Sequence, residues 1–124
     1  MKPTLAFATL ITIGLLMSCG GRSSPLSLAV QPATASATYF GTTGEFEDAI
    51  LTATLSNGDA PTGLQWKTSD PSCIVIAGTN ANSVDIACSA ECANGDDEFK
   101  TATITATAQG LTGTSSVSCT WTYL

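Results

Sequence analysis

The sequence predicts an all-β protein, a β-sandwich of about seven strands that follows a cleaved N-terminal signal helix. Thr, Ser, Ala and Gly dominate the chain after residue 19, and Thr and Val suit a half-buried pleated surface. No segment there shows the 3.6-residue apolar repeat of an amphipathic helix. Short alternating segments instead recur at regular spacing between turn sequences, which is typical of a sandwich rather than a parallel α/β sheet.

Residues 1–18 have the layout of an export signal. Lys2 supplies a positive charge, and residues 5–17 form an uninterrupted, mostly apolar run. As a helix this run would be ~20 Å long, whereas the hydrocarbon core of a bilayer is ~30 Å thick. We therefore expect residues 1–18 to be a signal peptide rather than a membrane span.

The predicted strands follow from residue 26. The first, residues 26–30, ends before Pro32; residues 33–38 are small and polar, and residues 39–40 suit a short strand. Gly, Asn and Pro turns separate the later strands, and the last hairpin turn is expected at residues 109–113. These later strands are predicted at residues 47–55, 63–68, 73–77, 84–88, 100–108 and 115–123.

Three aromatic residues concern the core. Trp66 has the same parity as Leu64 along its strand, so we expect its side chain in the core. Trp121 and Tyr123 come at the end of the last strand. They could pack as a lid or stay partly exposed, and the sequence leaves both arrangements open.

Four cysteines follow Cys19, and an even number in an exported chain predicts two disulfides. A zinc site is disfavoured because the spacing lacks two short Cys pairs. Cys73 and Cys88 are equidistant from the turn at residues 80–81, so a hairpin centred there would place them opposite each other, within bridging distance. This favours Cys73–Cys88 with Cys92–Cys119. The pairings Cys73–Cys119 with Cys88–Cys92, and Cys73–Cys92 with Cys88–Cys119, stay open.

The residues Leu16-Met17-Ser18-Cys19 resemble the lipobox of bacterial lipoproteins, in which the Cys becomes the first residue after cleavage. The resemblance implies diacylglycerol on the Cys19 sulfur and a further acyl chain, such as palmitate, on its amine. Two or three chains anchor a protein to a membrane without spanning it. In the enteric sorting rule, Asp directly after the lipidated Cys would signal retention at the inner membrane. Gly20 occupies that position, so the rule favours the outer membrane over the inner. Residues 19–25 would then be the lipidated Cys with a tether of ~20 Å, and residues 26–124 the domain.

The stretches 50–55, 57–59 and 63–72, which contain Trp66 and a Ser-Asp-Pro-Ser turn, resemble bacterial immunoglobulin-like domains of group 2 (BIG2). The Thr-Ala-Thr-Ile-Thr-Ala-Thr run at 101–107 matches the family's last strands as well. Cys73 and the insertion at 89–98 depart from the family pattern. The resemblance implies an immunoglobulin-like sandwich of the kind found in surface adhesins and extracellular spacers, with no shared active site.

Composition disfavours several function classes. The chain has no His, which excludes His-based catalysis and His-ligated metals, and we expect neither an enzyme nor a cofactor. After residue 18 three Lys/Arg stand against ten Asp/Glu, a net charge of −7 that disfavours nucleic acid. One weak Ca²⁺ candidate remains, the acidic loop with Glu91, Asn94, Asp96, Asp97 and Glu98, although solvated loop charges are the simpler interpretation.

The sequence as a whole predicts an exported, lipid-anchored and non-enzymatic envelope module that contacts the membrane through Cys19. It would bind a protein or glycan partner, or act as an accessory subunit, through its loops and strand edges. The alternative is a purely structural envelope lipoprotein without a specific ligand.

Overall fold

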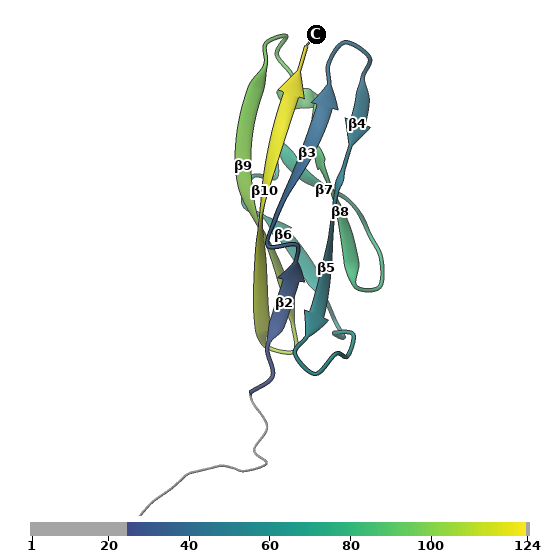
Figure 1. The fold of residues 1–124 in the computed structure, drawn as a ribbon, viewed down its shortest axis with the longest axis vertical. Helices are drawn as coiled ribbons and strands as arrows, with labels where there is room; N and C mark the ends of the chain where they lie inside the picture. The colour runs from purple at the N-terminus through teal and green to yellow at the C-terminus, as the bar shows by residue number, and fades with distance from the viewer. Residues whose placement is uncertain (1–24, 124) are drawn as a thin grey trace, which may run out of the picture.

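The computed structural model describes residues 25–123. These residues form nine strands and one short 3₁₀ turn, and no helix among them is long and apolar enough to cross a membrane (Figure 1). The elements are β2 (Leu28–Gln31), β3 (Thr34–Phe40), β4 (Glu45–Glu47), β5 (Ala49–Leu55), β6 (Gln65–Thr68), β7 (Ile74–Thr79), β8 (Ser83–Cys88), η2 (Ala90–Cys92), β9 (Glu98–Ala108) and β10 (Leu111–Thr122).

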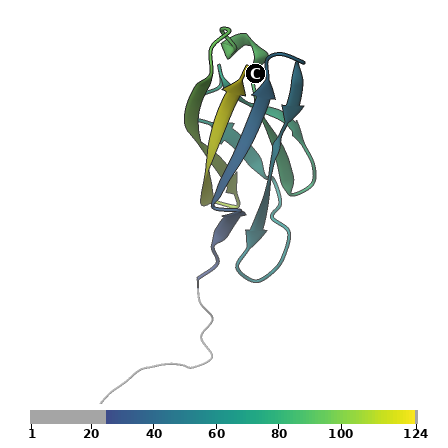
Figure 2. The same cartoon turned by 45° about the horizontal axis from the view of Figure 1, so that its top comes forward.

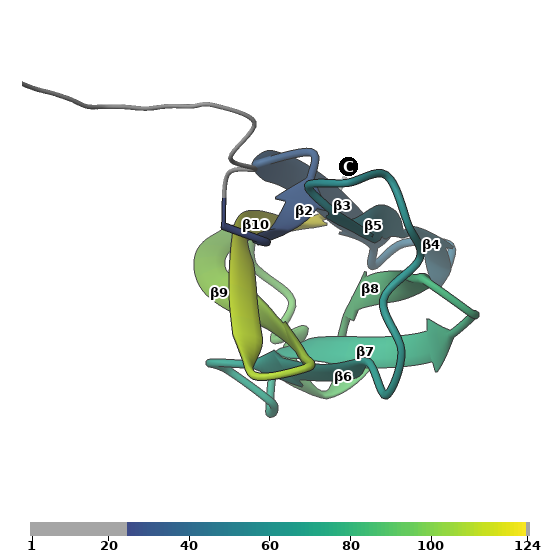
Figure 3. The ribbon, with the colours of Figure 1, turned by 90° about the horizontal axis from the view of Figure 1, so that it is seen from below.

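The strands form a sandwich of two sheets, which confirms the predicted fold class. One sheet has the order β4-β3-β10-β9-β6 and the other the order β2-β5-β8-β7. The four-stranded order is that of strands A, B, E and D in an immunoglobulin domain, and β10, β9 and β6 take the places of G, F and C. Seen along the length of the molecule, the strands surround a central core (Figure 3).

The first strand of the sandwich is divided between the two sheets. β2 pairs with β5, the chain then crosses at the cis Gln31–Pro32 bond, and β3 runs parallel to β10 in the other sheet (Figure 2). The crossing is fastened by Ser115, whose hydroxyl donates to the Pro32 carbonyl oxygen at 2.7 Å. The sequence predicts a short strand at residues 39–40, and β3 begins earlier, at Thr34. The small side chains of residues 34–38 carry little alternation, and pairing with β10 supplies the order instead.

The predicted strand 47–55 is also divided, because the chain changes sheet at Asp48. β4 pairs with β3, while β5 pairs with β2 and β8 in the other sheet. β3 and β4 raise the strand count from about seven to nine, because the sequence predicts only a short strand at residues 39–40 and no strand at residues 45–46.

The core lies between the inward faces of the two sheets. Every second residue of β5, and of β9 from Ala102 onward, is buried, as the alternation predicts, and many of these residues are alanines. Of the two aromatic residues whose exposure the sequence left open, Trp121 has no exposed surface and is the largest of the fully buried side chains, whereas Tyr123 is half-buried. The others in this group are Leu51, Ile74, Ile86, Ile104, Val84, Val117, Cys88 and Cys119.

The β9–β10 hairpin is tighter than predicted. Strand pairing continues up to Ala108 and Leu111, so the turn consists of Gln109 and Gly110 alone. Both residues have positive φ, 55° and 77°, as a two-residue type I′ turn requires. Farther along β10, a Cβ at Gly113 would lie 2.7 Å from the Leu28 carbonyl oxygen, so only glycine allows β2 and β10 this close approach.

Candidate functional site

Cys19, the predicted lipidation site, lies outside the described residues, as do the signal peptide and most of the tether. The described chain begins at one end of the sandwich, which it shares with the β9–β10 turn and the loop between β5 and β6 (Figure 1). We call this the Pro25 end. The C-terminus, the β3–β4 turn and the loop before β9 lie at the opposite end, the far end.

The structure contains two disulfides, as predicted, but the favoured pairing is wrong. Cys73 bonds to Cys92, and Cys88 bonds to Cys119, which is one of the two alternatives that the sequence left open. The cause is the position of the turn between β7 and β8, because Thr79 lies opposite Val84 and the turn is therefore centred on residues 81–82 rather than 80–81. A bulge between Ile76 and Gly78 moves the pairing back by one position only, so Ile74 rather than Cys73 lies opposite Cys88.

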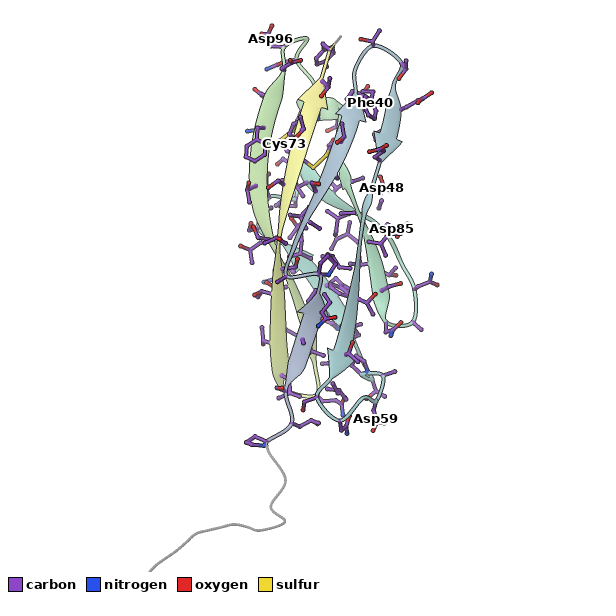
Figure 4. The ribbon with its side chains drawn as sticks, in the orientation of Figure 1. Phe40, Asp48, Asp59, Cys73, Asp85 and Asp96 are labelled. Atoms are coloured by element: carbon purple, nitrogen blue, oxygen red, sulfur yellow. A yellow bond between two sulfur atoms is a disulfide. The ribbon has the colours of Figure 1, made fainter. Side chains whose placement is uncertain are left out.

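The Cys88–Cys119 bond joins the two sheets, and we refer to it as the inter-sheet disulfide. It connects β8 to β10 through the core, and both cysteines are almost fully buried. The Cys73–Cys92 bond lies nearer the surface and ties η2 to the turn before β7 (Figure 4). Together the two bonds hold the segment after β8, which the sequence suggested as an insertion, against the sandwich.

Ser89 connects this disulfide-bonded region to the core. Its backbone N–H donates to the Cys73 carbonyl oxygen at 2.8 Å, and its hydroxyl accepts from the Glu91 N–H at the start of η2. Its carbonyl oxygen accepts a hydrogen bond from Trp121 Nε1 at 2.8 Å. The buried indole is therefore satisfied, as a buried Trp N–H usually is.

Trp66, unlike Trp121, has an indole N–H that is not satisfied by a hydrogen bond. Its side chain is half-buried and packs against the core cluster, so it lies on the predicted face of β6. Its Nε1 is buried and has no hydrogen-bond partner. An unpaired buried donor costs about 1–3 kcal/mol, so this orientation is held by ring packing.

The polar side chains of the acidic loop contact separate partners instead of converging on one point. Asn94 Nδ2 donates to Glu98 Oε2 at 3.0 Å, and the Asp97 carboxylate accepts from the Tyr123 backbone N–H at 2.8 Å. Asp96 receives its contact through its backbone N–H, which donates to the Asn94 side chain. Within residues 25–123 no group of three or more Cys, Asp or Glu side chains is arranged to hold a metal ion. The weak Ca²⁺ candidate therefore gains no support from the geometry.

A different site emerges on the outside of the four-stranded sheet. A hollow of about 330 Å³ lies beside β7 and β8, and its walls are mostly apolar. Phe46, Val75, Ala77 and Ala87 contribute apolar side chains, and Asp48 contributes a carboxylate. Ile50, two residues beyond Asp48, is 62% exposed.

Two carboxylates mark this surface. Asp85 on β8 lies opposite Ile50 on β5, and in Figure 4 it lies below Asp48 on the same side of the molecule. Burial raises the pKa of the Asp48 carboxyl above its usual value, and the negative charge of Asp85 raises it further. We call the surface formed by Phe46, Asp48, Ile50, Val75, Asp85 and Ala87 the acidic-apolar face.

Sequence reasoning missed the acidic-apolar face. One signal was present, because Ile50 falls on the face of its strand that is otherwise occupied by Thr52 and Thr54. The remaining members come from β4, β7 and β8 and from Asp48 between β4 and β5, and only the packing of the two sheets brings them together.

Another hollow, of about 380 Å³, lies toward the far end between the β3–β4 turn and Thr122. Phe40, Glu45 and Glu47 are among its lining residues.

No protein-family profile matches this chain, and no curated protein sequence is significantly similar to it.

Proposed function

We propose that this chain is a lipid-anchored module of the bacterial cell envelope, attached through Cys19 and displaying an immunoglobulin-like domain. The observation that carries the proposal is the lipobox-like run Leu16-Met17-Ser18-Cys19 at the end of a short apolar segment. Cys is required at one position of that motif, and it is present there. The BIG2 resemblance and Gly20 favour an extracytoplasmic domain at the outer membrane.

The disulfides support an exported location. Both bonds form between cysteines that follow Cys19, and such bonds persist in oxidising compartments outside the cytosol. Cys19 then accounts for the odd cysteine among the five of the chain. One lipid-bearing cysteine and two disulfides account for all five cysteines of the chain.

The domain's role would be binding rather than catalysis. The absence of His from the sequence supports this, together with the compact sandwich, whose described surface offers shallow hollows. The tether after Cys19 extends at most ~20 Å, so the Pro25 end would face the membrane and the far end would point away. A protein or glycan partner, or a larger envelope complex, would be met by the sides and the far end.

Replacement of Cys19 tests the anchor. We expect Cys19→Ala to move the protein out of the membrane fraction or to leave it unprocessed, and to abolish labelling by a radioactive or clickable palmitate. The Cys73→Ala/Cys92→Ala double variant is the matched control, because it also loses cysteines but should keep the label. A Cys19→Ala protein with unchanged mass, label and membrane association would refute the proposal.

A purely structural envelope lipoprotein is the alternative. Crosslinking in intact cells, followed by purification of the protein, distinguishes the two roles. A reproducible partner at a defined surface supports binding, and crosslinks to abundant envelope components alone support the structural role.

A further inference from the structure

The acidic-apolar face combines exposed apolar side chains with carboxylates that lack a cation. Ile50 is 62% exposed and Phe46 is 53% exposed, although large apolar side chains are usually covered. Phe46 is held in place by Tyr39, with ring centroids 5.0 Å apart and planes at 56°. The aromatic wall of the hollow is therefore fixed before any partner arrives.

The sheet register explains why these groups share one surface. Val75 on β7 lies opposite Ala87 on β8, and Asp85 lies opposite Ile50 on β5. Side chains of directly paired residues point to the same face of a sheet. Asp48 lies where the chain leaves β4 for β5, and it lines the hollow together with Ala87.

The face is negatively charged without compensation. Asp48 and Asp85 make no salt bridge with any residue of the described chain, in which the cations are Lys67 and Lys100. Both lysines belong to the other sheet, on β6 and β9. A partner's cation placed between the two carboxylates would relieve the repulsion that Asp85 exerts on Asp48.

We propose that the acidic-apolar face binds a protein segment in which an apolar side chain is flanked by Lys or Arg. The apolar side chain would occupy the hollow between Phe46 and Val75, and the cation would lie against Asp48 and Asp85. This inference deepens the proposed binding function and rests on it.

A protein segment fits this face better than a glycan does. Glycans are recognised through exposed flat aromatic rings and a dense set of hydrogen-bonding groups. Here Phe46 does offer an exposed ring, but the hollow around it is mostly apolar and Asp48 is its one charged lining residue, so the dense set of hydrogen-bonding groups is missing. A hollow with apolar walls and a charged rim is instead suited to an apolar anchor with adjacent cations.

The test uses the exported protein, purified from whichever cell fraction contains it, and two synthetic probes. The first is the pentapeptide acetyl-Lys-Val-Lys-Val-Lys-amide, and the second has Glu in place of each Lys. We expect the Lys peptide to shift amide NMR signals of β5, β7 and β8, and the Glu peptide to leave them unchanged. Failure of the Lys peptide to bind at millimolar concentration, equal binding of the Glu peptide, or shifts confined to other strands would overturn the proposal.

Charge variants locate the interaction. Asp48→Asn/Asp85→Asn should weaken binding of the Lys peptide by about tenfold or more, because both charge contacts are lost. Asp59→Asn/Asp96→Asn is the matched control, since it changes the net charge equally at the two ends of the molecule (Figure 4), and it should change binding less than about twofold. Equal weakening by the two double variants would show unspecific charge attraction and refute the site.

A neutral variant separates the apolar contribution and guards against loss of folding. Ile50→Thr places the residue type of its neighbours Thr52 and Thr54 at an exposed position, so the fold should be retained. It should weaken the Lys peptide severalfold while the NMR spectrum of the free protein stays native, and unchanged binding would contradict the apolar part of the proposal. Because these measurements do not depend on the Cys19 anchor, their failure is distinguishable from failure of lipidation.

Discussion

The two tryptophans allow the same substitution to be made in opposite hydrogen-bonding environments. Trp121 is fully buried, and its Nε1 donates to the Ser89 carbonyl oxygen at 2.8 Å. Trp66 is half-buried, and its Nε1 is buried without a partner. Replacing each with Phe removes the donor and part of the ring. The two variants should therefore differ clearly in free energy of unfolding, although the same side-chain atoms are removed in both.

The expected magnitudes follow from what each change leaves behind. Trp121→Phe strands the Ser89 carbonyl and opens a small cavity in the core, so it should lower the free energy of unfolding by about 2–4 kcal/mol. Trp66→Phe loses apolar contact but also removes a donor whose burial without a partner costs about 1–3 kcal/mol. These contributions oppose each other, so Trp66→Phe should change the free energy of unfolding by no more than about 1 kcal/mol in either direction.

Urea unfolding followed by far-ultraviolet circular dichroism measures both values, because the signal does not depend on the residue that is replaced. Both disulfides must stay oxidised, and the wild-type slope must be retained for the midpoints to be compared as free energies. The reasoning would be refuted if Trp66→Phe cost as much as Trp121→Phe. A larger loss for Trp66→Phe would show that its packing, rather than its unpaired donor, dominates.

Three further predictions concern the disulfides, the close strand contact and pH. Limited reductant should open the Cys73–Cys92 bridge before the inter-sheet disulfide, because thiolate attack needs access to a sulfur atom. Alkylation and peptide mass spectrometry establish the order of reduction, and a reversed order would contradict the burial argument. Gly113→Ala should lower the free energy of unfolding by about 1–3 kcal/mol because its Cβ meets the β2 backbone. Gly78→Ala, where an added Cβ meets nothing, should be close to neutral, and equal midpoints in urea would refute the contrast. Asp48→Asn should be more stable than wild type near neutral pH, with the difference vanishing at about pH 3. Folding raises the Asp48 pKa, so between the unfolded and folded pKa values the native state binds more protons than the unfolded state. Wild type therefore loses stability as pH rises through this range. Melting temperatures of the two proteins that run parallel across this range would contradict the prediction.

The predicted strands were most accurate where the pattern is local and strong. The Thr/Ala alternation at 100–108 and the alternation at 49–55 both correspond to strands whose inward residues are buried as expected. The prediction was incomplete at residues 34–38, where the side chains are small and the order comes from pairing with β10. Burial of Trp121 could not be decided either, because the residues that cover it come from other strands.

The disulfide pairing shows how one residue of backbone geometry changes a conclusion. The hairpin between β7 and β8 exists as predicted, but its turn is centred one residue later than expected, with Thr79 opposite Val84. The bulge between Ile76 and Gly78 recovers only part of this offset, so Cys88 lies opposite Ile74, and its buried side chain reaches Cys119 on the other sheet. Apolar periodicity does not fix the centre of a turn within a polar stretch, and the preferred pairing was wrong for that reason.

The sequence by itself determined the all-β class, the approximate positions of most strands and the presence of two disulfides. Each follows from properties carried by neighbouring residues, namely period-two alternation, turn residues and an even cysteine count. Only the tertiary structure decided which cysteines pair, where the chain changes sheet at Pro32 and Asp48, and that Ile50, Asp48 and Asp85 share one surface. These depend on register and on contacts between segments far apart in the chain, and the energy that selects them arises only when the two sheets pack.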